Sequence, residues 1–265
     1  MLNCQHYKFY RATPDRNPFL TQTKKFQKGW EYILKIQLVS DSSSNLKQMA
    51  NANFSSAPLK VIVGDQEFTD DETIDLPAMM KALKQYKGKT STACPSVEDW
   101  TKAFGDADVV LGATITSGLS GCYNCARIAA EEYTDAHPDR KVFIFDSLST
   151  GTELELLMEK IQELSTSSLS FEEQCSALVE YSKHTHLMFS LESLENFAKN
   201  GRVSPAVAKA VGILGIRIVG KASAEGTLEP MHKCRGEKTP SSVCSTVCWR
   251  RVTAAERFAS PTPTI

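Results

Sequence analysis

Residues 109–129 read "VVLGATITSGLSGCYNCARIA", and this stretch decides the fold class. It begins with an apolar run, Val109 to Ala113, which is typical of a buried β-strand. A turn rich in glycine, serine and threonine follows, and apolar side chains then recur at helical spacing from Cys122 to Tyr133. The stretch therefore predicts a strand, a tight turn and a helix in immediate succession.

The same pattern occurs on both sides of this stretch. Residues 33–45 ("ILKIQLVSDSSSN") and 141–151 ("KVFIFDSLSTG") each place a serine-rich turn after an apolar strand, and a helix follows the second from about Glu153. Strands that alternate with helices of this length are typical of a parallel sheet. Because the carboxyl ends of parallel strands share one edge, we expect the serine-rich turns to gather there, where ligands of such folds bind.

Shorter sequence motifs predict the remaining helices and strands in the first half of the chain. Residues 59–68 ("LKVIVGDQEF") predict a strand that begins a hairpin, and Asp75 opens a helix whose inner face holds Met79, Met80, Leu83 and Tyr86. Ser96 and Asp99 have the spacing of a capping box and begin another helix.

The pattern changes near residue 166. We predict an α/β domain over residues 36–165 and a second, smaller α+β domain over residues 166–238, with a helix from Ser204-Pro205 and a hairpin across Glu225-Gly226. Residues 1–35 look like a disordered extension, and residues 239–265 look like an aberrant or disordered tail because neither shows sustained periodicity.

Charge and hydropathy narrow the classes of function. Thirty lysines and arginines balance 31 acidic residues, so the net charge of -1 provides no field that would attract nucleic acid. A basic arm within residues 1–35 leaves nucleic-acid binding as a minor alternative. No apolar run has the length of a membrane span and the N-terminus lacks a secretory signal, so we expect a cytoplasmic protein without stable membrane insertion.

The eight cysteines raise the question of a metal site. Cys122 and Cys125 have the spacing of half such a site, but the helical pattern places both on the buried stripe, where small apolar cysteines are common. We therefore expect structural cysteines, no metal and no cofactor.

Ser120 is the polar residue best placed to act at the central turn. At the N-cap of the following helix, its hydroxyl can accept a hydrogen bond from the helix backbone or donate one to a ligand oxygen. The turn contains no nucleotide-binding glycine motif and no nucleophile elbow, and no histidine completes a triad. We predict no catalytic residue. An enzyme, a phosphotransferase or hydrolase acting on a small anionic substrate at this edge, remains the alternative.

Six motifs together resemble the DegV family of fatty-acid-binding proteins, and the resemblance covers residues 36–238. They are "LVSDSSSNL", "STACPSVEDW", "TITSGLSGCYNCARIA", "FIFDSLSTG", "LENFAKNGRVS" and "GTLEPMHKCRGEK". The resemblance implies a two-domain α/β protein that is not an enzyme and holds one long-chain fatty acid between its domains. It also implies a possible partner, a fatty acid kinase, to which some members present the acid for phospholipid synthesis.

The resemblance also implies the ligand-binding residues. Thr92 and Ser120 match the residues that bind the carboxylate, and Arg202 matches an arginine near the ligand. The family continues after the last motif through a further βαβ portion that has no counterpart beyond residue 238, so the chain looks truncated. The segment "PAVAKAVGILGIRIV" (205–219) is a candidate lining for an apolar tunnel.

Overall fold

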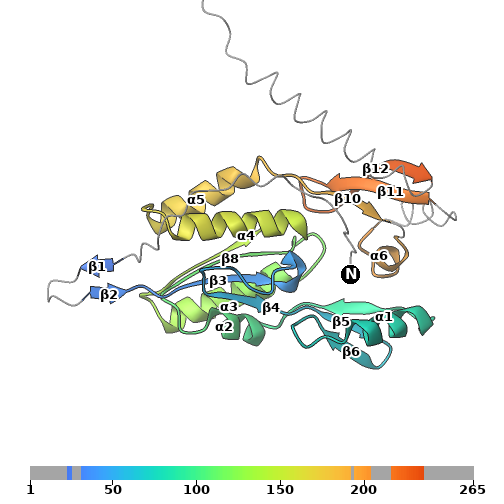
Figure 1. The fold of residues 1–265 in the computed structure, drawn as a ribbon, viewed down its shortest axis with the longest axis horizontal. Helices are drawn as coiled ribbons and strands as arrows, with labels where there is room; N and C mark the ends of the chain where they lie inside the picture. Colours follow the sequence, from blue (N-terminus) through green and yellow to red (C-terminus); the bar gives the residue numbers. More distant parts are fainter. Residues whose placement is uncertain (1–22, 26–30, 192–193, 204–215, 236–265) are drawn as a thin grey trace, which may run out of the picture.

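A four-stranded parallel sheet forms the centre of the molecule (Figure 1). The computed structural model describes residues 23–25, 31–191, 194–203 and 216–235. The sheet has the order β4-β3-β8-β9, and every neighbouring pair is parallel. Its strands are β3 (Ile36–Asp41), β4 (Phe54–Ala57), β8 (Val109–Thr114) and β9 (Lys141–Asp146). The predicted α/β class is confirmed.

Helices cover both faces of this sheet. The helices α2 (Val97–Phe104) and α3 (Cys122–Ala136) lie on one face, and α4 (Thr152–Ser165) and α5 (Phe171–Ser182) lie on the other (Figure 1). Successive side chains of a strand point to opposite faces, so Val39 joins the core under α2 and α3 whereas Leu38 joins the core under α4 and α5. Both faces are buried, which explains the continuous apolar runs in β8 and β9.

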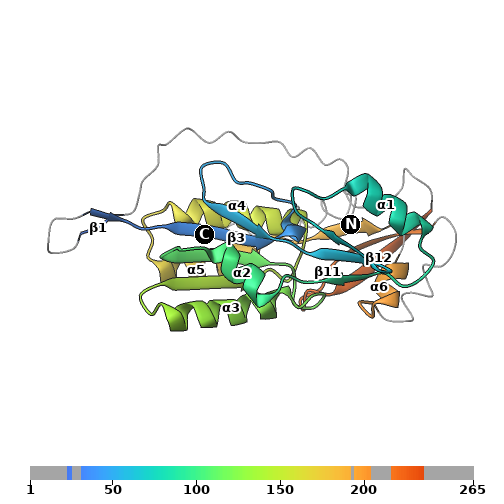
Figure 2. The ribbon, with the colours of Figure 1, turned by 90° about the horizontal axis from the view of Figure 1, so that it is seen from below.

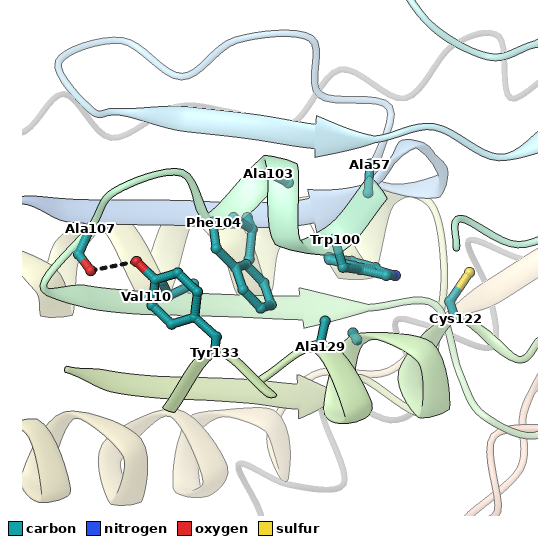
Figure 3. Packing of buried hydrophobic residues seen from close by; sticks show 11 residues of the cluster. Ala57, Trp100, Ala103, Phe104, Ala107, Val110, Cys122, Ala129 and Tyr133 are labelled. Carbon is teal, nitrogen blue, oxygen red and sulfur yellow. Dashed lines mark hydrogen bonds between the residues drawn. The ribbon is translucent and has the colours of Figure 1, made fainter. Parts of the chain in front are cut away.

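Aromatic side chains fill the core beneath α2 and α3 (Figure 3). The rings of Phe104 and Tyr133 meet edge to face with centroids 5.6 Å apart, and Trp100 is fully buried beside Phe104. The Tyr133 hydroxyl donates a hydrogen bond of 2.8 Å to the Ala107 carbonyl. This bond ties α3 to the loop that leads into β8.

A smaller antiparallel sheet with the order β6-β5-β7 accompanies the first half of the chain. It consists of β5 (Lys60–Val63), β6 (Gln66–Thr69) and β7 (Ser91–Ala93), and α1 (Leu76–Gln85) connects β6 to β7. The predicted hairpin, the Asp75 cap and the Ser96 capping box are confirmed. The predicted inner face of α1 is only partly right, because Met79 is fully buried whereas Met80 and Tyr86 are 42% and 40% exposed.

The second half of the chain forms another antiparallel sheet, β10-β11-β12. Its elements are β10 (Met188–Leu191), α6 (Glu195–Lys199), β11 (Ile216–Ala222) and β12 (Leu228–Arg235), and the hairpin across Glu225-Gly226 is confirmed. Phe189, Leu191, Leu194 and Ile218 form a separate core there. By contrast, α5 contributes Leu178 to the core under α4, so this helix packs with the parallel sheet.

Two further findings concern the ends of the chain. Within residues 1–35, β1 (Thr23–Lys25) and β2 (Glu31–Ile33) pair as a short antiparallel ribbon. The expected helix at Ser204-Pro205 and the tail over residues 239–265 lie outside the described residues. In the part of the chain that is described, no helix is long and apolar enough to cross a bilayer.

Candidate functional site

Hydrogen bonds connect the ends of the parallel strands to the turn after β8 at the carboxyl edge of the sheet. Asp41 ends β3, and its Oδ2 accepts a hydrogen bond of 2.7 Å from the backbone N–H of Ile115 in the turn after β8. Asp146 ends β9, and its Oδ1 accepts a bond of 3.1 Å from the N–H of Ser117 in the same turn. The predicted gathering of these turns is therefore confirmed.

Asp41 is the most deeply buried ionisable group at this edge. Its other carboxylate oxygen accepts bonds from both the N–H and the hydroxyl of Ser43. Burial raises the pKa of Asp41 above its usual value, although the hydrogen bonds from Ser43 and Ile115 oppose this rise. Sequence reasoning missed both Asp41 and Asp146 as organisers of the site. The available signal was that each follows an apolar strand and precedes a serine.

Ser120 lies at this edge, but it is not the N-cap of α3 as predicted. The turn continues for one more residue because the Ser120 N–H donates to the Thr116 carbonyl (3.2 Å), and the N-cap is Gly121. The Ser120 hydroxyl accepts a bond of 3.3 Å from the Cys122 N–H and lies 3.2 Å from the Cys122 Sγ. The side chain is half-buried, at the first turn of the helix.

Thr92 lies in the small antiparallel sheet. It is part of β7, where it pairs with Val61 of the small sheet, so it does not follow a strand of the parallel sheet. The Thr92 residue is exposed. The end of β7 nevertheless reaches the start of α3, because a side-chain carbon at Gly121 would lie only 3.3 Å from the Cys94 Sγ. The structure thus brings the strand of Thr92 to the helix that follows Ser120.

Arg202 joins these two parts. It follows α6, and its Nε donates a hydrogen bond of 3.2 Å to the carbonyl of Leu119, the residue before Ser120. Asn200, two residues earlier, donates from its Nδ2 to the Thr90 carbonyl of the chain entering β7 (2.9 Å). The end of α6 therefore contacts both the Ser120 turn and the strand of Thr92, and sequence reasoning did not identify Asn200.

The β11–β12 hairpin closes over the same edge. The Glu225 carbonyl comes so close to Gly118 that a side-chain carbon there would lie 2.8 Å away. A side-chain carbon at Gly226 would lie 2.0 Å from the Thr116 Oγ1. Figures 1 and 2 place both small sheets beyond the carboxyl ends of the parallel strands. The candidate site therefore lies where the three sheets meet.

Several hydrogen-bond donors at this edge would suit a small anion. Hydroxyl groups, backbone N–H groups near a helix N-terminus and one guanidinium are donors that suit a carboxylate. Over the described residues, no group of three or more histidine, cysteine or acidic side chains could hold a metal ion. Cys122 is buried as expected, whereas Cys125 is half-buried and its Sγ lies 3.9 Å from that of Cys94.

Comparisons with known proteins agree on one family. Its model, that of the DegV family, matches residues 35–255 and so continues beyond residue 238, where the resemblance of the motifs ends. A DegV domain-containing protein of Streptococcus pneumoniae is 41% identical over 206 residues, which cover 76% of this chain and 73% of the relative.

Two similar crystal structures contain a fatty acid. A DegV family protein from Eubacterium eligens, loaded with heptadecanoic acid, has a TM-score of 0.77 and 40% identity, covering 80% of this chain and 77% of that one. The Fatty Acid Kinase (Fak) B3 protein of Streptococcus pneumoniae, loaded with linoleic acid, has a TM-score of 0.79 and 38% identity, covering 82% and 79%. With a matching family model, a relative at this identity and the same fold, the chain belongs to the DegV family.

Proposed function

We propose that this protein is a carrier that binds one long-chain fatty acid and holds the carboxylate with Thr92 and Ser120, with Arg202 beside them. The observation that carries this proposal is the position of α6, whose end bonds both to Leu119 next to Ser120 and to Thr90 next to the strand of Thr92. These two contacts bring the end of α6 to the Ser120 turn and to the chain entering the strand of Thr92, which supports grouping the three donors around one ligand. The fatty acids in two similar structures support the same class of ligand.

The nature of these donors favours a carboxylate over a phosphate ester. A phosphate carries up to two negative charges, and its sites commonly add lysine or several arginines. Arg202 contacts the Ser120 turn through the Leu119 carbonyl, and the other two donors assigned to the carboxylate, Thr92 and Ser120, are neutral. Most of the affinity then comes from the alkyl tail, at about 0.8 kcal/mol for each buried methylene group.

The same proposal includes a protein partner, but it assigns no catalytic step to this chain. One similar structure is a protein of a fatty acid kinase, so we propose that this chain likewise presents its fatty acid to a kinase subunit in the cytoplasm for phospholipid synthesis. The apolar lining of the tail is assigned to the segment 205–219, of which residues 216–219 begin β11 and the rest lie outside the described residues.

Site variants test the carboxylate assignment. We expect Thr92→Val and Ser120→Ala each to weaken oleate binding by about 1 to 3 kcal/mol, the range for a hydrogen bond to a charged group. Isothermal titration calorimetry with palmitate and oleate measures the loss. Two matched controls are Thr69→Val in the same small sheet and Ser117→Ala in the same turn, and both should bind as the unaltered protein does.

The ligand class has its own test in the same assay. A set of sugar phosphates is titrated beside the two fatty acids. Binding of a phosphate ester without any response to palmitate or oleate would contradict the carrier proposal and favour an enzyme that acts on a small anionic substrate. Unchanged affinity in both site variants would contradict the residue assignment alone.

A further inference from the structure

Two cysteines face each other beside the candidate carboxylate site. The Sγ atoms of Cys94 and Cys125 are 3.9 Å apart, although the residues lie 31 positions apart in the sequence. Cys94 directly follows β7, and Cys125 is in the first turns of α3. Both residues are half-buried, so a small reagent can reach the pair.

The surrounding structure favours this pair over Cys122 and Cys175. Cys122 is fully buried and its Sγ is 3.2 Å from the Ser120 hydroxyl, while Cys175 lies on α5 at the opposite face of the parallel sheet. Gly121 matters as well, because a larger residue would place its side chain 3.3 Å from the Cys94 Sγ. The missing side chain leaves Cys94 close to the helix.

We propose that Cys94 and Cys125 are a modification site at which a low-molecular-weight disulfide forms an intramolecular disulfide. One thiolate attacks the small disulfide RSSR, forms a mixed disulfide and releases RS⁻. The second thiolate attacks the protein sulfur of that mixed disulfide and releases another RS⁻. Two protein thiols are oxidised and one small disulfide is reduced to two thiols, because the two released thiolates take up the two protons that the protein thiols lose.

The geometry requires only a local adjustment. A disulfide has a sulfur–sulfur distance of about 2.05 Å, so the two Sγ atoms must approach by about 2 Å, which side-chain rotation and a small shift of the loop after β7 can supply. Burial and the neighbouring Cys94 raise the pKa of the Cys125 thiol. Because the thiolate is the reactive form, we expect exchange at this pair to become faster as the pH rises.

The position of this disulfide gives it a consequence for the ligand, and this part rests on the proposed function. The bond would connect the strand of Thr92 to the helix that follows Ser120, so the two groups assigned to the carboxylate could no longer separate. A ligand that enters and leaves when these elements move apart would then exchange severalfold more slowly.

Peptide mapping of the full-length protein tests the disulfide itself. The protein is equilibrated with mixtures of reduced and oxidised glutathione, remaining thiols are blocked, and tryptic peptides are analysed by mass spectrometry. We expect a cross-link between the peptide that holds Cys94 and the peptide that holds Cys122 and Cys125. It should disappear in Cys94→Ser and Cys125→Ser and persist in Cys122→Ser and in the distant control Cys175→Ser.

Ligand exchange is measured separately, as the release of a fluorescent fatty acid from the oxidised and reduced forms. A cross-link that disappears in Cys122→Ser, or no cross-link at any glutathione ratio, would overturn the assignment of the pair. Equal release rates from the two forms would overturn the effect on the ligand. Reduced protein that binds no fatty acid would contradict the proposed function and leave the mapping result intact.

Discussion

At the scale of single residues, two aspartates arrange the edge on which the candidate site is built. Asp41 and Asp146 each end a parallel strand, and each accepts a backbone N–H from the turn after β8. Their carboxylates hold the turn that contains Ser120 by bonds across neighbouring strands. Removing a buried acceptor leaves its donors unsatisfied, which costs about 1 to 3 kcal/mol per group.

The buried Asp41 carboxyl should make the stability of the protein depend on pH. Because its pKa is raised above the usual 3.8, the native state binds more protons than the unfolded chain between 3.8 and the raised value. The contribution of Asp41 to the free energy of unfolding therefore falls as the pH rises through this window. Asp41→Asn removes the titrating group, so the stability of the variant relative to the unaltered protein should increase with pH.

Denaturant unfolding at a series of pH values from about 3.5 upward measures how this difference changes with pH. Asp139→Asn, which removes an exposed carboxyl in the loop before β9, serves as the control. A difference between Asp41→Asn and the unaltered protein that stays constant with pH would show that the carboxyl does not titrate in this range.

At the scale of elements, the β11–β12 hairpin is held against the Ser120 turn by a close approach at a glycine. Gly226 has a φ of +71°, which residues with a side chain rarely adopt. Its missing side chain also leaves room for Thr116 and Leu148, whose atoms would lie 2.0 and 2.9 Å from an added carbon. Backbone conformation and packing therefore both require glycine there.

Gly226→Ala should destabilise the protein by more than the backbone conformation alone explains. The left-handed conformation costs about 1 to 2 kcal/mol for a residue with a side chain. The contact with Thr116 adds to this cost because the hairpin must move away. Gly201→Ala is the control for stability, since Gly201 has a φ of +72° and an added carbon there meets nothing within 4 Å.

Urea unfolding of both variants separates the two contributions. Equal losses of free energy in Gly226→Ala and Gly201→Ala would mean that the hairpin does not pack tightly on the turn. Weaker oleate binding by Gly226→Ala, with normal binding by Gly105→Ala at the end of α2, would support the proposed place of the hairpin in the ligand site.

At the scale of the whole molecule, the candidate site belongs to no single sheet. Thr92 lies in the β6-β5-β7 sheet, Ser120 follows the parallel sheet, and Arg202 follows α6 beside the β10-β11-β12 sheet. Single hydrogen bonds such as Asn200 to Thr90 and Arg202 to Leu119 connect these parts. A ligand that contacts all three should therefore stabilise their arrangement.

We expect oleate to raise the free energy of unfolding in proportion to the logarithm of its concentration. At a free concentration of about one hundred times Kd the gain is about 2.7 kcal/mol. Thermal unfolding measures the gain, and hydrogen exchange should show added protection at residues 91–93, 116–121 and 223–227 together. An alcohol of the same chain length, which lacks the carboxylate, should give a smaller gain. Protection confined to one sheet would contradict a shared site.

Most of the elements and their order could be predicted from the sequence alone, whereas the β1–β2 ribbon was not predicted. Apolar periodicity predicted the parallel strands and the helices around them, and Asp75 and Ser96 marked helix starts because a cap bonds to a backbone N–H three residues away. The motifs that resemble the DegV family are also local, because each is a short run of neighbouring residues that can be recognised without the fold. A local sequence pattern indicates the hydrogen bonds within an element and the face of that element that is buried.

Only the tertiary structure decided how distant elements meet. The pairing of Thr92 with Val61, the bond from Arg202 to a carbonyl 83 residues earlier and the approach of Cys94 to Cys125 depend on how whole elements pack. The same holds for the N-cap of α3 at Gly121, because the Ser120 turn is held by carboxylates from two other strands. Such contacts produce no periodic pattern in the sequence. Each depends on the packing of the complete fold and not on neighbouring residues.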